Sequence, residues 1–315
     1  MKKIRLKAMA KINLGLDVVG KREDGYHEVK MIMQTIRMYD QIELESTEEP
    51  GIRVSTNLNY LPTNEDNLVY KAAKLLMDEF DVKKGVKIDL RKFIPVAAGM
   101  AGGSSDAAAV MVGVNRLFHL NLSRKELMER GVKIGADVPY CILRGTALAE
   151  GIGEKLTHLP PAPSCYVLIA KPGIHVSTKF VYTNLKVNEL ESHPDIDGQI
   201  RAIRSGDLKK VAELCGNVLE TVTIPAYPVI EEIKNVMKAG GALNACMSGS
   251  GPTVFGLFDD REKAQAVYDT LYGGELAKQV YLTTFLTTGN PEDKRALTDQ
   301  RDCGSFAGSL SARMG

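Results

Sequence analysis

A run of small residues in the first third of the chain, PVAAGMAGGSSD at residues 95–106, constrains the fold more than any other feature. Its glycines permit backbone turns that a Cβ would hinder, and the alanine-rich segment 107–118 that follows has the composition of a helix. A helix start exposes unpaired N–H groups and a partial positive charge, which suit a phosphate. An ordinary glycine-rich turn followed by a serine-capped helix would have a similar sequence. The paired Ser104 and Ser105 nevertheless favour phosphate binding. A carboxylate repels a phosphate, so we expect the side chain of Asp106 to point away from the ligand.

This loop differs from the commoner nucleotide-binding motifs. A P-loop requires a lysine directly after its last glycine, where this chain has Ser104. The Gly-x-Gly-x-x-Gly spacing of a dinucleotide-binding fold is absent, and so are the His-Arg-Asp and Asp-Phe-Gly motifs of protein kinases. No acidic or histidine cluster has the spacing of metal ligands, so we expect no protein-held metal centre.

The composition is that of a globular protein that works in water. The chain has 315 residues, which suggests two domains. It has 40 Lys and Arg residues against 39 Asp and Glu residues, and this balance gives no general electrostatic case for binding nucleic acid or an anionic membrane. Five scattered cysteines without a Cys-x-x-Cys pair are typical of reduced thiols. The reduced thiols favour a cytoplasmic protein. No segment approaches the roughly 20 apolar residues of a membrane-spanning helix.

Expected helices and strands occur in mixed blocks, which favours an α+β fold over a regular βαβ alternation. Pro-Pro-Ala-Pro at 160–163 is the best candidate for a linker, so we expect domains over 1–159 and 160–288. The polar, aperiodic residues 289–315 are expected to form a disordered tail. The patterns predict strands within 3–46, 87–93, 166–170, 243–247, 253–258 and 279–286, helices over 67–80, 107–118, 124–135, 207–219, 228–238 and 261–272, and a stiff loop at 136–139.

Polar residues in two of these segments could act on a ligand. Lys11 and Asn13 lie two apart in an expected strand and therefore share a face, although an ordinary exposed strand face gives the same pattern. Asp137 is held between Gly135 and Pro139, where a carboxylate could accept a proton from a substrate hydroxyl. An aspartate that simply ends a helix or forms a turn would have the same neighbours.

Two turns offer further candidates. Ser-Gly-Ser-Gly-Pro at 248–252 lies between two expected strands, so its backbone could approach a ligand closely, or could simply form a tight hairpin. Tyr26 and His27 follow an Asp-Gly turn and offer an aromatic face and a hydrogen-bonding ring. A partly buried pair in a hairpin is the alternative for these two residues.

These motifs, in this order, resemble those of the GHMP kinase superfamily, which groups galacto-, homoserine, mevalonate and phosphomevalonate kinases. Residues 95–105 resemble its second signature, with Met-Ala at 100–101 where many relatives carry Leu-Gly, and residues 248–255 resemble its third. Three narrower stretches are similar to the branch that acts on a cytidine-diphosphate methylerythritol in the non-mevalonate isoprenoid route: AKINLGL at 10–16, REDGYH at 22–27 and GADVP at 135–139.

The resemblance implies a fold and a reaction. The N-terminal domain would be similar to ribosomal protein S5 domain 2, and the C-terminal domain would be ferredoxin-like. The protein would use ATP and Mg²⁺ to phosphorylate the 2-hydroxyl of the cytidine-diphosphate methylerythritol, a small molecule bound between the domains. It would have no nucleic-acid or membrane partner and would be a monomer or a weak homodimer.

The resemblance also implies roles for residues that match the family motifs. Lys11 and Asp137 would be the catalytic pair. Backbone N–H groups of residues 102–105 would hold the β- and γ-phosphates of ATP. The substrate site would include Asn13, Tyr26, His27 and Tyr182, with Phe180 as the alternative to Tyr182. The ATP loop would comprise Pro95, Val96, Ala97, Ala98, Gly99, Met100, Ala101, Gly102, Gly103, Ser104 and Ser105.

Three other functions stay open from the sequence. A different GHMP kinase, such as one that acts on mevalonate or homoserine, would share the two glycine-rich signatures. A nucleotide-binding regulator without catalysis would need neither Lys11 nor Asp137, so the presence of both disfavours it. Nucleic-acid binding on a fold similar to S5 is weakened by the near-neutral charge.

Overall fold

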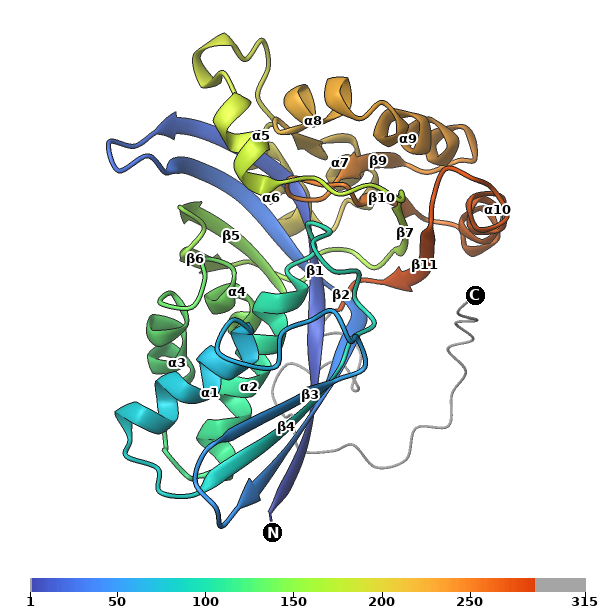
Figure 1. The fold of residues 1–315 in the computed structure, drawn as a ribbon. Helices are drawn as coiled ribbons and strands as arrows, with labels where there is room; N and C mark the ends of the chain where they lie inside the picture. Colours follow the sequence, from blue (N-terminus) through green and yellow to red (C-terminus); the bar gives the residue numbers. More distant parts are fainter. Residues whose placement is uncertain (1, 287–315) are drawn as a thin grey trace.

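A hairpin of two long strands forms the centre of the fold. In the computed structural model, which describes residues 2–286, β1 (Lys3–Lys21) and β2 (His27–Thr47) pair antiparallel along their length. The hairpin curves from the N-terminal half of the protein to the C-terminal half (Figure 1). Irregularities in its pairing accompany this curvature, because a β-bulge bends a strand and increases its twist. The pairing shifts register between Met9 and Lys11, between Asn13 and Gly15, and between Val18 and Gly20.

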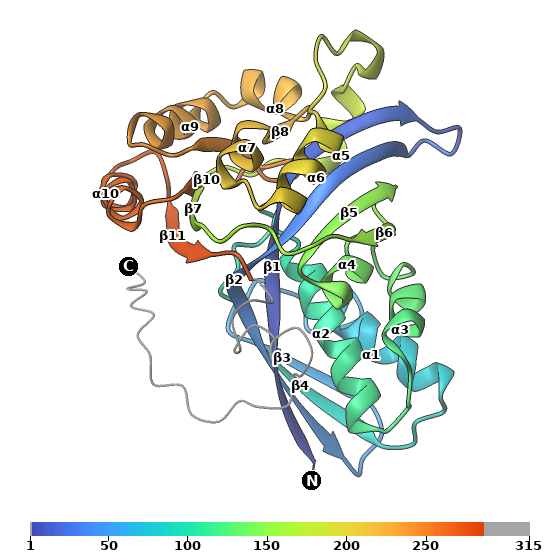
Figure 2. The ribbon, with the colours of Figure 1, turned by 180° about the vertical axis from the view of Figure 1, so that it is seen from behind.

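Other strands extend the hairpin into a seven-stranded sheet, and four helices lie on one side of it (Figures 1 and 2). The order along the sheet is β3-β4-β2-β1-β8, while β5 pairs with β2 and β6 pairs with β5. The helix α2 packs on β1 and β2 and places its first turn near the middle of the hairpin. These elements are β3 (Ile52–Thr56), β4 (Gly85–Arg91), β5 (Thr146–Gly151), β6 (Lys155–His158), β8 (Gly216–Asn217), α1 (Leu68–Glu79), α2 (Gly102–Leu117), α3 (Arg124–Gly131) and α4 (Val138–Leu143).

The second sheet has four antiparallel strands in the order β11-β7-β10-β9. Helices connect β7 to β9 and β10 to β11, which gives the ferredoxin-like arrangement and confirms the expected two-domain α+β fold. The elements are β7 (Tyr166–Lys171), β9 (Asn244–Met247), β10 (Val254–Phe258), β11 (Gln279–Thr284), α5 (Thr178–Asn184), α6 (Ile196–Ser205), α7 (Leu208–Glu213), α8 (Glu220–Ala226), α9 (Val229–Ala239), α10 (Arg261–Tyr272) and the short 3₁₀ helix η1 (Val187–Glu189).

The two sheets share an apolar core. Ile12 and Leu14 of β1 are fully buried in one cluster with Ile169 and Phe255 of the second sheet. Because side chains alternate along a strand, the adjacent residues Lys11 and Asn13 face away from this cluster. The long hairpin therefore carries two polar side chains to the boundary between the two halves of the protein.

The structure departs from the expected elements in several places. Residues 207–219 form α7 followed by β8, because residues 216–217 pair with β1 instead of continuing the helix. The expected loop at 136–139 is wrong: α4 begins within it, and Pro139 is tolerated in a first helical turn because no N–H is needed there. The helices α5, α6 and α8 and the strands β3, β5 and β6 were not expected. Residues 160–163 connect β6 to β7, so the boundary at 160 stays a prediction, and the expected tail at 289–315 lies outside the described residues.

Candidate active site

The glycine-rich loop ends in the first turn of α2. Ala101 caps this helix in a left-handed conformation, with φ 55° and ψ 30°, and the helix begins at Gly102. The amides of residues 102–104 have no helical acceptor because they lie in the first turn. The Ser105 N–H donates to the Ala101 carbonyl at 2.8 Å. The expected row of free amides therefore stops at Ser104, and the inclusion of the Ser105 amide was wrong.

Two side chains of this first turn point into the protein. The Ser105 hydroxyl donates to the carbonyl of Met9 and lies 3.2 Å from the Cys141 Sγ. Asp106 is buried, and its Oδ2 accepts a hydrogen bond from the Lys92 Nζ at 2.6 Å. Neither residue lines the cavity described below. The expected direction of the Asp106 side chain is confirmed, whereas the Ser105 side chain serves the packing of α2.

Lys92 forms a buried ion cluster behind the loop that the sequence analysis missed. Its ammonium pairs with both Asp106 and Asp40. Asp40 also accepts hydrogen bonds from the backbone N–H groups of Phe93 and Ile94, which lead into the loop. Burial lowers the pKa of Lys92, but the two carboxylates outweigh it and raise that pKa, while burial raises the pKa of Asp106 well above its usual range. The cluster ties the entry of the loop to the first turns of α2.

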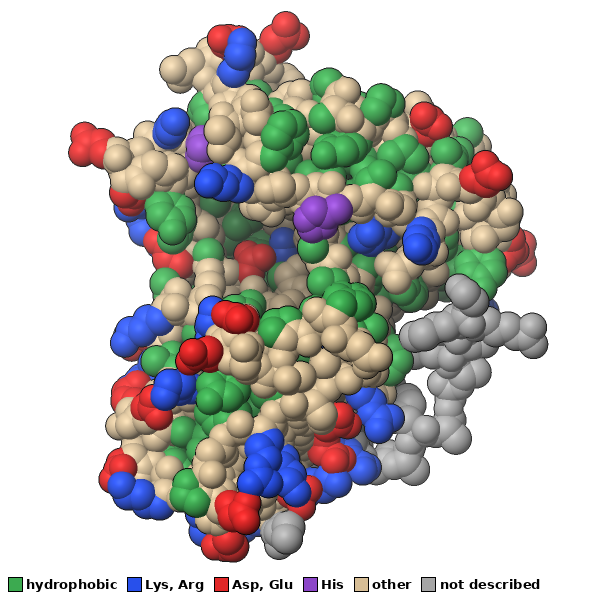
Figure 3. Space-filling model, in the orientation of Figure 1, with side chains coloured by type: hydrophobic (Ala, Val, Ile, Leu, Met, Phe, Trp, Pro, Cys, Tyr) green, Lys and Arg blue, Asp and Glu red, His purple; other side chains and the backbone are tan. Residues whose placement is uncertain are grey.

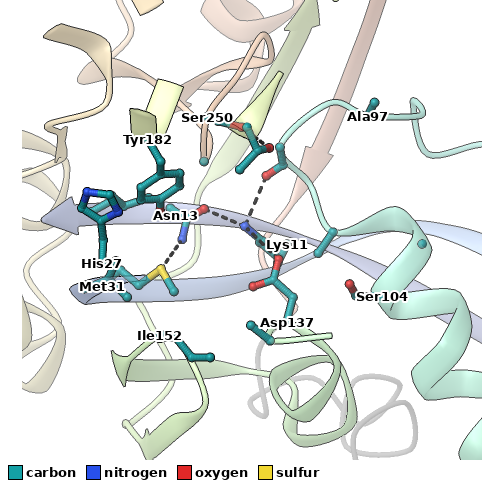
Figure 4. A pocket seen from close by; sticks show the side chains of 18 of the residues that line it. Lys11, Asn13, His27, Met31, Ala97, Ser104, Asp137, Ile152, Tyr182 and Ser250 are labelled. Carbon is teal, nitrogen blue, oxygen red and sulfur yellow. Dashed lines mark hydrogen bonds and ion pairs between the residues drawn. The ribbon is translucent and has the colours of Figure 1, made fainter. Parts of the chain in front are cut away.

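Lys11 and Asp137 meet beside this helix start (Figure 4). The Lys11 Nζ lies 3.7 Å from the Asp137 Oδ2, donates to the Asn13 Oδ1 at 2.7 Å and donates to the Gly99 carbonyl at 3.3 Å. Lys11 is 4% exposed, whereas the side chain of Asp137, at the start of α4, is 31% exposed. The amine is therefore fixed by its neighbours, and the carboxylate is open to a ligand.

The second glycine-rich turn packs directly on the first loop. It joins β9 to β10, and the Ser248 hydroxyl donates to the Gly99 carbonyl at 2.9 Å. A Cβ on Gly249 would lie 3.2 Å from the same carbonyl oxygen. Gly249 and Ser250 also line the cavity. The turn is thus a tight hairpin that also lines the cavity. The two expectations for it, a hairpin and a turn that faces a ligand, are therefore compatible.

The aromatic candidates gather at the other end of the cavity. The rings of His27 and Tyr182 lie 5.3 Å apart at an angle of 42° (Figure 4), and Tyr26 is exposed beside them. Burial and the nearby charge of Lys21 lower the pKa of His27, so its ring is neutral at pH 7. Tyr182 lines the cavity and Phe180 does not, which favours Tyr182 of the two candidates.

These groups surround one cavity of about 620 Å³. Figure 3 shows it as a hollow between the two halves of the molecule. The loop contributes residues 97–99 and 101–104, while Pro95, Val96 and Met100 do not line it. Within residues 2–286, Asp137 is the one carboxylate on its wall, and no group of three His, Cys, Asp or Glu side chains could hold a metal ion. No helix in the same range is long and apolar enough to cross a bilayer.

Comparison with known proteins identifies relatives that cover about nine-tenths of the chain. The family described as GHMP kinases N terminal domain matches residues 67–145, and GHMP kinases C terminal matches residues 199–274. The chain is 58% identical to the 4-diphosphocytidyl-2-C-methyl-D-erythritol kinase of Lachnospira eligens over 91% of its length and 100% of the relative. It is 51% identical to the kinase of the same name from Clostridium perfringens, with 91% and 100% covered.

Solved structures give the same grouping. A crystal structure of a 4-(cytidine 5'-diphospho)-2C-methyl-D-erythritol kinase aligns with a TM-score of 0.77 at 30% identity and covers 90% of this chain and 99% of the other. The homoserine kinase of Cytophaga hutchinsonii aligns with a TM-score of 0.74, with 90% and 96% covered. Its identity is 21%, so this second likeness concerns the fold alone.

Proposed function

The chain belongs to the GHMP kinase family and, within it, groups with the 4-diphosphocytidyl-2-C-methyl-D-erythritol kinases, and from this premise we propose that it transfers the γ-phosphoryl group of ATP to the 2-hydroxyl of 4-diphosphocytidyl-2-C-methyl-D-erythritol. The reaction is a step of isoprenoid precursor synthesis. The observation that carries the proposal is the 3.7 Å pair of Lys11 and Asp137, which stands between the start of α2 and the aromatic end of the cavity.

ATP binds with its phosphates at the start of α2. The amides of residues 102–104 and the positive end of the helix dipole stabilise the β- and γ-phosphates. The glycine and alanine residues of the loop that line the cavity allow the phosphates to approach the backbone. The γ-phosphate then faces Lys11 and Asp137, which line the same cavity.

The chemical step is an in-line displacement. The 2-hydroxyl oxygen of the substrate forms a bond to the γ-phosphorus, the bond from that phosphorus to the β–γ bridging oxygen breaks, and ADP leaves. Asp137 accepts the proton of the hydroxyl, which is the role of a general base. The Lys11 ammonium, held by Asn13 and Gly99, orients the carboxylate and the hydroxyl and offsets negative charge on the transferring group.

The donor set on the cavity wall fits a Mg²⁺ ion carried mainly by phosphates and water. Mg²⁺ is commonly bound through one or two carboxylates together with substrate phosphates, and here the Asp137 carboxylate and the Ser104 hydroxyl are the oxygen donors near the phosphate site. When bound, the ion would neutralise negative charge on the phosphates of ATP.

The aromatic end of the cavity recognises the cytosine. Tyr26 and Tyr182 provide ring faces for stacking, and the neutral ring of His27 both donates and accepts hydrogen bonds at the polar edge of the base. Asn13, which accepts from Lys11 and lies beside Met31, lines the path from the base to the reacting hydroxyl. A soluble nucleotide and a charged small substrate suit a cytoplasmic enzyme, which we take to be a monomer or weak homodimer.

Coupled detection of ADP tests this function. We expect ADP release with ATP, Mg²⁺ and 4-diphosphocytidyl-2-C-methyl-D-erythritol, and no comparable release with mevalonate or homoserine. Turnover of either of those alcohols alone would assign the protein to another GHMP activity. ATP binding without ADP release for any of the alcohols would instead favour a nucleotide-binding regulator.

A further inference from the structure

One buried amide holds the β9–β10 turn from behind. Asn217 of β8 is 6% exposed and does not line the cavity. Its Nδ2 donates to the carbonyls of Met247 and Gly249, each at 2.8 Å. Its Oδ1 accepts from the Leu219 N–H at 3.0 Å. Because both N–H bonds and the oxygen of the amide are engaged, the side chain is held in one orientation.

The same residue also belongs to the central sheet. Asn217 pairs with Leu16 of β1 in a parallel ladder, and the Val218 N–H donates to the Leu16 carbonyl at 3.0 Å. Further along, β1 carries Lys11. Asn217 therefore joins the strand that carries the Lys11 amine to the turn that packs on Gly99.

Only one of the two bonds that Asn217 donates is explained by the edge of the sheet. The strand β9 is the outer strand of the second sheet, and buried backbone groups at such an edge need partners. The Met247 N–H donates to Glu220 at 2.7 Å, and the Met247 carbonyl accepts from Asn217. The second bond of Asn217 goes beyond the strand to Gly249, inside the turn. This bond fixes the turn itself.

The turn passes its position on to the Lys11 amine through the carbonyl of Gly99. The Ser248 hydroxyl donates to this oxygen at 2.9 Å, and the Lys11 Nζ donates to it at 3.3 Å. A Cβ on Gly249 would lie only 3.2 Å from the same oxygen, so the turn and the loop are in close contact. A shift of the turn would therefore displace the Gly99 carbonyl and loosen one of the contacts that hold Lys11.

We propose that Asn217 is a positioning residue for phosphoryl transfer: by fixing the β9–β10 turn to β1, it keeps the Gly99 carbonyl where Lys11 can donate to it. This proposal rests on the proposed function and adds a residue that lies behind the cavity wall. A small misplacement of groups around a reaction lowers its rate steeply. The chemical step should therefore depend on Asn217 more than the affinity for either substrate does.

Asn217→Ala and Asn244→Ala separate this role from a purely structural one. Asn244 of β9 is the matched control, because its amide also donates to two backbone carbonyls, those of Ala212 and Cys215, away from the turn. Both variants should lower Tm. We expect kcat to fall about tenfold or more in Asn217→Ala and to change less than about twofold in Asn244→Ala, with KM for both substrates within about threefold. Asn217→Ser keeps one donor and replaces the alanine variant if that variant does not fold.

A double-mutant cycle with Ser248→Ala tests the path through Gly99. Because Asn217 and Ser248 act on the same carbonyl, their losses in kcat should not multiply, and the double variant should lose no more than about threefold beyond the larger single loss. The losses of Asn244→Ala and Ser248→Ala should combine independently. Independent losses for Asn217 and Ser248, or equal kcat in Asn217→Ala and Asn244→Ala, would overturn the proposal.

Hydrogen exchange separates this proposal from the proposed function. If the unaltered protein releases no ADP, the proposed function fails, but the amides of residues 248–251 still report whether Asn217 fixes the turn. They should exchange about tenfold faster or more in Asn217→Ala than in Asn244→Ala, because the turn would open more often. Equal exchange in the two variants would overturn the role of Asn217 whatever the reaction.

Discussion

The carbonyl oxygen of Ser248 lies 2.0 Å from the point where a Cβ on Gly99 would stand. The two glycine-rich segments, 149 residues apart in the chain, therefore touch backbone to backbone. The Gly99 carbonyl accepts hydrogen bonds from both the Ser248 hydroxyl and the Lys11 ammonium. The position of the Lys11 amine thus depends on contact between the two domains.

Gly99→Ala should disrupt this contact. The added methyl group would overlap a backbone atom, which no side-chain rotation can relieve, and φ at Gly99 is +73°. We expect a loss of at least roughly 2 kcal/mol in unfolding free energy and a fall of 10²-fold or more in kcat/KM for ATP, measured by urea denaturation and steady-state kinetics. Gly206→Ala is the control, because its φ is +72° with no atom within 4 Å. Equal effects of both variants would show that backbone strain, not the domain contact, matters at Gly99.

Ala101→Gly should stabilise the protein. Ala101 holds a left-handed conformation at the start of α2, which costs an L-residue roughly 1–2 kcal/mol and costs glycine little. We expect a gain of about 0.5–1 kcal/mol in unfolding free energy, since the freer unfolded chain offsets part of the relief. Ala108→Gly, inside the same helix, should instead lose about 1 kcal/mol. Destabilisation by Ala101→Gly would contradict this description of the loop.

Tyr182→Ala should weaken the binding of the cytidine substrate, whereas Phe180→Ala should not. Loss of one stacking face costs about 1–3 kcal/mol, so we expect KM for that substrate to rise about tenfold or more with KM for ATP unchanged. Phe180 lies on the same helix and is 41% exposed outside the cavity, which makes it a matched control. A larger effect at Phe180 would transfer the stacking role to that residue.

Substrate binding should weaken in acid through His27. Burial and the charge of Lys21 hold the pKa of His27 below its ordinary value of 6.5, so the ring keeps an acceptor nitrogen at pH 7. We expect KM for the cytidine substrate to be constant above pH 6.5 and to rise as the pH falls through the lowered pKa, with no such rise in His27→Asn. In that window the unfolded chain binds more protons, so His27 also lowers stability as the pH falls. The same acid rise in the variant would assign it to another group.

Local patterns were sufficient for much of the fold. The alternation along β1 predicted that Lys11 and Asn13 share a face, and the composition of 95–118 predicted the loop and its helix. The same alternation could have found Lys92: Ile88 and Leu90 are buried on one face of β4, and Lys92 is the next residue with that spacing. A lysine on a buried face needs a carboxylate partner, although the sequence does not say which.

The rest depended on contacts between distant segments. Lys11 and Asp137 are separated by 126 residues, and only the resemblance to a family brought them together before the structure did. The row of amides ends at Ser104 instead of Ser105 because Ala101 already caps the helix, a backbone detail that composition does not encode. Thr178, which lines the cavity, was missed because α5 has no strong sequence pattern, and its hydroxyl meets that of Ser250 from a different element.

The central claim is that Asp137 accepts a proton as phosphate moves from ATP to the acceptor alcohol, and single-turnover transfer of labelled γ-phosphate tests it most directly. Excess protein, γ-labelled ATP and 4-diphosphocytidyl-2-C-methyl-D-erythritol are mixed, and the labelled product is followed in the unaltered protein and in Asp137→Asn, which keeps the shape of the side chain. The account predicts transfer by the unaltered protein and a rate roughly 10²-fold lower or more in the variant, with ATP affinity retained. Transfer at an equal rate in Asp137→Asn would contradict it.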